Sequence, residues 1–220
     1  MAARRSLAKR LTGLWDTTRT RGAQVVIRQL LRRVGIRAIP FYYVRELLPA
    51  EIPAALTTLP EGFLFEEFGE NEVEVIASFR EHGDEVSAPG LLDNLRRGNR
   101  CLGIRRGEEI VAFTWCALDA SRSELYASVM QPNEAYLFNM YVKPSVRGHN
   151  IAAILRYKNY EVLRSLGRDT FYSITQASNK ASWRFKQKLG AEKLLLGLYL
   201  SLFGRFEGRW ILRRYPVRGT

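Results

Sequence analysis

A strand, a short turn and a long helix follow one another between residues 134 and 166, and this unit constrains the fold more than any other stretch. Residues 136–142 (YLFNMYV) are mostly aromatic or aliphatic and end at Lys143-Pro144, which predicts a strand that stops there. Beyond residues 147–150, apolar residues recur at three, four and seven-residue steps, which predicts a helix that ends at Gly167. The turn between strand and helix is basic and contains glycine. Because the first N–H groups of a helix have no partner within it and the helix dipole is positive there, this turn predicts a phosphate or pyrophosphate site.

Residues 144–152 (PSVRGHNIA) resemble the acyl-CoA loop of the GNAT acyltransferases, whose pattern is Arg/Gln-x-x-Gly-x-Gly/Ala. Arg147 and Ala152 match its ends, and Asn150 stands where the family usually has its middle glycine. Asparagine tolerates the left-handed backbone better than other non-glycine residues, so we expect the turn to survive this change. Residues 179–191 (NKASWRFKQKLGA) resemble the family's Asn-x-x-Ala/Ser helix that ends in Lys-x-Gly-Phe.

These two elements occur in the family's order, and a strand-like FYSITQ joins them, so the resemblance covers roughly residues 61 to 215. It implies an α+β fold of the GNAT type, a three-layer α/β/α arrangement. The central sheet would be mixed and mostly antiparallel, with helices on both faces.

The resemblance also implies a co-substrate, acetyl-CoA or another acyl-CoA, and a set of residues that bind it. Backbone N–H groups of the turn would hold the pyrophosphate, and the strand before it would pair with the pantetheine arm. One helix further along would line the rest of the groove. The implied cofactor-binding residues are Met140, Tyr141, Val142, Arg147, Gly148, His149, Asn150, Ile151, Ala152, Asn179, Ser182 and Phe185.

Catalysis in this family is direct transfer of the acyl group to an amine, which requires a base and is helped by an acid. Glu134 is the candidate base, and Tyr136 shares its face of the sheet if residue 134 already belongs to the strand. The alternative for Glu134 is a solvated residue at the start of the strand. The family often carries a tyrosine acid seven residues after the helix asparagine, where this chain has Lys186. Tyr172 or Tyr141 would then substitute, or water would protonate the thiolate.

Positive charge is concentrated at the N-terminus. The formal net charge is +12, and residues 1–37 hold ten Lys/Arg against one acid, Asp16. Leucines, valines and Trp15 recur at helical spacing among these basic residues, which is typical of a helix on an anionic membrane surface and also of a helix packed on its own domain. An organelle transit peptide has the same composition. Nucleic-acid binding is disfavoured because no interleaved aromatic set follows.

We therefore expect three segments: a basic amphipathic arm (residues 1–38), a proline-punctuated linker with an edge strand at 41–44 (residues 39–60), and a GNAT acyltransferase domain (residues 61–220). The apolar run 194–203 predicts a central strand buried on both faces. With two isolated cysteines and two histidines, a metal site is not expected.

The expected function is an acyl-CoA-dependent N-acyltransferase, most simply an N-acetyltransferase that acts on a small amine. An amino sugar of envelope polysaccharide synthesis is one acceptor by analogy. The alternatives are long-chain acyl transfer at a membrane and a module that binds acyl-CoA or a partner protein without turnover. We expect a cytoplasmic protein, either free or peripheral to the inner face of the membrane, and consider a homodimer.

Overall fold

The computed structural model describes residues 35–47, 54–79, 87–119, 121–122 and 126–216. The arm predicted at residues 1–38 therefore lies almost wholly outside the described residues. In chain order the elements are β1 (Ile36–Leu47), the 3-10 helix η1 (Ala54–Leu56), β2 (Phe63–Phe68), α3 (Glu70–Ala77), α4 (Ala88–Arg96), β3 (Arg100–Arg106), β4 (Glu109–Ala117), β5 (Ser121–Arg122), β6 (Ala127–Ser128), β7 (Glu134–Val142), the 3-10 helix η3 (Pro144–Val146), α5 (Ile151–Ser165), β8 (Thr170–Gln176), α6 (Lys180–Lys188), β9 (Glu192–Leu202) and β10 (Phe206–Arg214).

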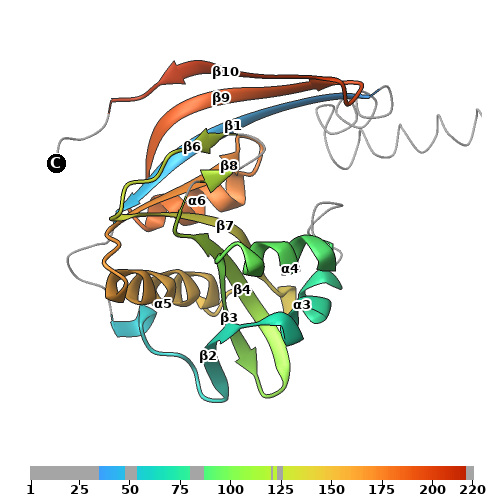
Figure 1. Ribbon diagram of the computed structural model, residues 1–220. Coiled ribbons are helices and arrows are strands. Elements are labelled where there is room, and N and C mark those ends of the chain that lie inside the picture. Colours follow the sequence, from blue (N-terminus) through green and yellow to red (C-terminus); the bar gives the residue numbers. More distant parts are fainter. Residues whose placement is uncertain (1–34, 48–53, 80–86, 120, 123–125, 217–220) are drawn as a thin grey trace, which may run out of the picture.

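Eight strands form one twisted sheet in the order β10-β9-β1-β8-β7-β4-β3-β2 (Figure 1). All neighbouring pairs are antiparallel except β7 and β8, which are parallel. Helices α5 and α6 lie on one face of the sheet, and α3 and α4 lie on the other. This is the mixed, mostly antiparallel, three-layer α+β fold that the family resemblance implies.

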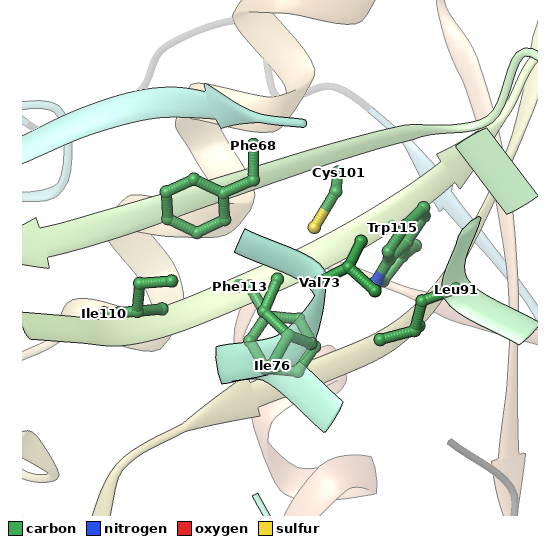
Figure 2. Close-up of a cluster of buried hydrophobic side chains, with 8 residues drawn as sticks. All are labelled: Phe68, Val73, Ile76, Leu91, Cys101, Ile110, Phe113 and Trp115. Atoms are coloured by element: carbon green, nitrogen blue, oxygen red, sulfur yellow. The ribbon is translucent and has the colours of Figure 1, made fainter. Parts of the chain in front are cut away.

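Two apolar cores hold the helices to the strands at the β2–β4 side. Side chains of α3 and α4, including Val73, Ile76 and Leu91, pack on Phe113 and Trp115 of β4 (Figure 2). On the opposite face, α5 packs on β3 and β4 through a second cluster: Ile104, Val111, Ala112, Val146, Ile151, Ile154 and Leu155. The helical periodicity read from residues 151–166 is therefore the periodicity of a buried stripe.

The edge strand expected at residues 41–44 is instead an interior strand. β1 is twelve residues long and pairs with β9 on one side and β8 on the other. β1 begins at Ile36, inside the segment assigned to the arm. Pro40 has no N–H to donate, but its carbonyl still accepts a hydrogen bond from Ala177 N at 2.8 Å, so this proline is tolerated within the strand. The prediction failed because the prolines on either side make the segment resemble a linker.

β9, in the apolar run 194–203, is buried on one face only. Leu195, Gly197, Tyr199 and Ser201 are buried, whereas the leucines between them are half-buried. β9 is also the second strand from the edge, with β10 outside it. The expectation of a central strand covered on both faces was wrong, because one face is apolar without being fully covered.

Candidate active site

The parallel strands β7 and β8 separate part of the way along their length. Pairing runs from Glu134 with Thr170 to Leu137 with Ser173 and stops, although β7 continues to Val142 and β8 to Gln176. The cause lies in β7: Asn139 has a φ of 46°, and three residue steps on β7 (Phe138 to Tyr141) oppose two on β4. A bulge of this kind bends a strand. We call the resulting opening the β7–β8 split.

The β7 edge that faces the split is formed by Met140, Tyr141 and Val142, the residues expected to pair with a pantetheine arm. Their other edge is paired to β4, and no strand of the described residues pairs with the edge at the split. Peptide groups along such an edge accept an extended ligand as an additional strand. The side chains diverge: Met140 faces α5, whereas Tyr141 stacks on Phe79 of the opposite layer at 5.2 Å.

The turn that follows the strand has the backbone expected of an anion site. Gly148 has a φ of 91° and Asn150 a φ of 58°, so both are left-handed, and α5 begins directly after them at Ile151. The side chains from Arg147 to Asn150 are exposed, and Arg147 Nε donates to the carbonyl of Val142 at 3.1 Å. The prediction that asparagine replaces the middle glycine in this conformation is confirmed. The turn presents the first N–H groups of α5 at the mouth of the split.

Helix α6 forms the opposite side of the split. Asn179 caps it, with Oδ1 accepting from Ser182 N at 3.0 Å, and the Ser182 hydroxyl lies 3.2 Å from that of Thr175 on β8. The amide nitrogen of Asn179 is thus the donor that this residue can offer to a ligand. Phe185 is half-buried and packs against the cluster that contains Tyr160 and Phe171. The structure brings these three residues to the same side of the split, opposite the turn.

The candidate catalytic residues lie in the paired part of β7 and β8, beyond the closed end of the split. Tyr172 donates a hydrogen bond to Glu134 at 2.9 Å, and the other Glu134 oxygen accepts from Gln131 N at 2.8 Å. Tyr136 is buried and stacks on Phe138 at 5.7 Å. Burial, followed by the Glu134 carboxylate, raises the pKa of Tyr172 to about 12, so this phenol stays protonated at neutral pH. Glu134 lies three residues, or ~10 Å along the strand, from the last β7–β8 pair.

An aromatic wall beside Tyr172 was missed by sequence reasoning. Tyr43 of β1 stacks on Tyr172 at 5.3 Å with an angle of 6° between the rings, and Tyr126 lies 4.7 Å from Tyr43. The Tyr43 hydroxyl also lies 3.0 Å from that of Ser128, and burial raises its pKa well above the usual range. This wall lies on the face opposite α5 and α6.

A buried cluster of charges on the other face was also missed. Glu46 of β1 is fully buried and lies 3.5 Å from Arg156 Nε and 3.8 Å from Lys186 Nζ. Its oxygens also accept from the hydroxyls of Tyr160, at 2.6 Å, and Ser173. Burial alone would raise the pKa of Glu46, but Arg156, Lys186 and the two hydroxyl donors lower it on balance. Burial lowers the pKa of Lys186 to about 8, against the opposing pull of Glu46.

The described residues contain no group of three or more side chains suited to a metal ion, and no described helix is long and apolar enough to cross a membrane.

The comparisons with known proteins agree with this geometry. The family model described as "Acetyltransferase (GNAT) family" matches residues 62–191, which is more than half of the chain. The chain belongs to the GNAT acetyltransferase family. The match includes β7, the turn, α5, β8 and α6, but β1, β9 and β10 lie outside it. No curated protein sequence matches the chain.

Solved structures of similar fold are distant in sequence. A GNAT-family acetyltransferase, described as putative, from Novosphingobium aromaticivorans has a TM-score of 0.55 at 18% identity, over 76% of this chain and 66% of the other. A GCN5-related N-acetyltransferase from Sphaerobacter thermophilus has a TM-score of 0.53 at 15% identity, over 88% and 58%. A glucosamine N-acetyltransferase region of a fungal β-N-acetylglucosaminidase has a TM-score of 0.55 at 12% identity, over 84% and 22%. The chain thus spans less than two thirds of each neighbour's length, and these similarities show the fold.

Proposed function

We propose that this protein transfers an acyl group, most simply acetyl, from acyl-CoA to an amine of a small acceptor. The observation that carries the proposal is the continuous path from the β7–β8 split to the left-handed turn at the start of α5. An extended pantetheine arm would pair with the edge of Met140 to Val142 that faces the split, and its pyrophosphate would lie on the N–H groups of residues 147–152, with Arg147 adding charge. Asn179, Ser182 and Phe185 would line the other side.

The proposed base is Glu134, acting through water on the acceptor amine. Its carboxylate is held by Tyr172 and by the backbone of Gln131, on the same face as Tyr136 and the aromatic wall. Because the pKa of Tyr172 is raised to about 12, this residue acts as a donor that orients Glu134. Acceptor amines, amino sugars among them, would therefore enter between the aromatic wall and the split.

Calorimetry with CoA and acetyl-CoA on the full chain tests the proposal, and two glycines supply matched variants. Gly148 and Gly107 both have positive φ, 91° and 59°, and a Cβ at either site would meet nothing within 4 Å. A valine is strained at both positions, but only Gly148 belongs to the turn. We expect Gly148→Val to weaken CoA binding at least tenfold and Gly107→Val to leave it within twofold. No CoA binding by the wild-type protein would refute the function, and binding without transfer to any amine in a broad panel would favour a module without turnover.

A second candidate is transfer of a long acyl chain at a membrane surface. It is favoured by large apolar side chains that remain exposed on the β9–β10 hairpin, including Phe203, Phe206 and Trp210. A competition assay separates the two candidates. The long-chain reaction is supported if palmitoyl-CoA displaces bound acetyl-CoA at a far lower concentration than CoA does. It is excluded if palmitoyl-CoA and CoA displace acetyl-CoA equally well.

A further inference from the structure

The buried charge cluster lies at the closed end of the β7–β8 split and touches both of its strands. Ser173, which holds Glu46, is the last residue of β8 paired to β7. Lys186 Nζ donates to the Ser173 hydroxyl at 2.7 Å and to the carbonyl of Ile174, the next residue, at 3.3 Å. From the other side, Arg156 Nη2 lies 3.4 Å from the sulfur of Met140 on β7. Both cations therefore border the point where the strands part.

The cluster contains one more positive charge than its internal pairing requires. Glu46 is the only carboxylate within reach among the described residues, and both of its oxygens are already engaged by two hydroxyls and two cations. Arg156 is 2% exposed and its Nη1 has no hydrogen-bond partner, while Lys186 is 4% exposed. Buried charge without a counter-charge is costly. An ion pair that served only the fold would be complete with Glu46 and one cation.

We propose that Lys186 and Arg156 form a binding site for the sulfur of CoA, stabilise the negative charge that develops on it, and that Lys186 supplies its proton. This inference rests on the proposed acyl transfer. The acceptor nitrogen bonds to the acyl carbon, the carbon–sulfur bond breaks, and its electron pair passes to sulfur. The sulfur takes a proton from Lys186 Nζ, and the acceptor nitrogen loses one through solvent water to the Glu134 carboxylate. Lys186 regains a proton from solvent water after CoA leaves.

The surroundings of Lys186 suit this role. The groups that face it are Glu46 from β1, Arg156 from α5 and Ser173 from β8, with Tyr160 of α5 on the far oxygen of Glu46. Burial lowers its pKa to about 8, so at neutral pH it is charged yet gives up a proton more readily than an exposed lysine does. A donor whose pKa lies close to that of a thiol transfers its proton at little cost in either direction.

One residue of the proposed sulfur site comes from outside the segment that matches the GNAT family. Lys186 and Arg156 lie within the segment that matches the GNAT family, whereas Glu46 belongs to β1, outside the match. The strand that joins the sheet from the N-terminal side thus supplies the carboxylate that allows two cations to remain buried beside the split.

Calorimetric titration with CoA and with desulfo-CoA, which lacks only the sulfur, tests the proposal on the full chain without an acceptor. In the bound form Lys186 Nζ and the CoA sulfur together hold one proton. Below pH 8 the free lysine and the free thiol are both protonated, so binding must release one proton. Well above pH 8 both free groups have lost their protons, so binding must take one up. We therefore expect the affinity for CoA, divided by the affinity for desulfo-CoA, to rise from pH 6.5 and to reach a maximum of at least tenfold between pH 8 and 9. At higher pH this ratio should fall.

Lys186→Met should bring this ratio to about one at every pH while desulfo-CoA still binds within threefold of wild type, which also reports that the variant is folded. Lys188→Met, two residues along α6 at an exposed position, is the matched control and should keep the maximum. Lys186→Arg should keep the preference for CoA but lose the decrease at high pH, because a guanidinium does not titrate there.

A wild-type ratio near one at all pH values, or a maximum that survives in Lys186→Met, would overturn the sulfur site while CoA binding itself stands. Failure of the wild-type protein to bind either ligand would instead remove the proposed acyl transfer. The two failures are therefore distinguishable.

Discussion

Substitutions at Glu46 and Lys186 are expected to lower stability by very different amounts, although the two residues share one ion pair. Glu46→Gln leaves two buried cations without a counter-charge, and loss of one partner of a buried pair costs about 3–5 kcal/mol. Lys186→Met leaves Glu46 with Arg156, a balanced pair, and removes hydrogen bonds worth about 1 kcal/mol each. Urea denaturation at pH 7 should therefore show a large loss of unfolding free energy for Glu46→Gln and a small one for Lys186→Met. Equal losses would mean that Lys186 serves the fold as much as Glu46 does.

The lowered pKa of Lys186 predicts that the stability of the protein depends on pH. Between pH 8, its folded pKa, and 10.5, its ordinary value, the unfolded chain holds the lysine proton and the folded chain does not. Stability then rises with pH, by about 1.4 kcal/mol per pH unit for one proton. Buried cysteines and tyrosines titrate nearby, so the quantity to measure is the unfolding free energy of wild type minus that of Lys186→Met. This difference should increase from pH 8 to pH 10; a flat difference would place the folded pKa of Lys186 near its ordinary value.

Single residues of the site differ in how far the sequence could reveal them. Arg147, Gly148 and Asn150 stand in a local pattern, so their role as a turn could be read directly. Glu46 and Tyr43 could not be found this way, because they reach the site only when β1 pairs with β8, whose residues lie more than a hundred positions away. Lys186 was visible as a departure from the family's tyrosine, but its burial depends on that same strand.

At the scale of elements, local patterns predicted the strand–turn–helix unit directly. The apolar run and the helical spacing located β7 and α5, and the family resemblance located β8 and α6. The bulge at Asn139 was not predicted, because YLFNMYV looks like an uninterrupted strand. The departure of β7 from β8, which creates the split, is therefore a consequence of strand pairing that this short segment does not encode by itself.

Packing between β1 and β9 depends on a missing side chain. A Cβ at Gly197 would lie 2.4 Å from the ring of Phe41, its partner across the two strands. We expect Gly197→Ala to lower stability by about 1–3 kcal/mol through this overlap. Phe41→Leu should restore part of the loss when combined with it, and a double-mutant cycle in urea measures that coupling. Purely additive effects would show that the overlap is relieved elsewhere.

At the scale of the whole molecule, β1 joins two halves of the sheet. β8 belongs to the segment that matches the GNAT family and β9 does not, and β1 is hydrogen-bonded to both. Deletion of residues 1–34 leaves every described strand intact, so we expect a cooperative unfolding transition close to that of the full chain. Deletion of residues 1–47 removes β1 and Glu46, and we expect it to abolish that transition. A cooperative transition that survives the longer deletion would show that β8 and β9 can pair without β1.

The side of the sheet formed by β9 and β10 carries an apolar surface. β10 is the outermost strand of the sheet (Figure 1). Its residues Trp210 and Phe206 pair with Leu198 and Leu202 of β9, so the four side chains share one face. Trp210 lies over Gly208 on this face and is 52% exposed, and Phe206 is 69% exposed. Soluble proteins seldom leave contiguous apolar surface open without a partner. The basic N-terminal segment precedes this region directly, because the carbonyl of Gly35 accepts from Phe203 N.

An anionic lipid surface suits both features, since exposed aromatic residues enter the headgroup region and basic residues are attracted to its charge. We expect the full chain to co-sediment with vesicles that contain phosphatidylglycerol and to do so at least fivefold less with pure phosphatidylcholine. Trp210→Glu should weaken the binding to anionic vesicles by a similar factor. Leu64→Glu is the matched control, because Leu64 is 60% exposed on β2, at the opposite edge of the sheet. Binding that is lost equally in both variants would reflect net charge alone, and binding unchanged by Trp210→Glu would exclude this face as the contact with lipid.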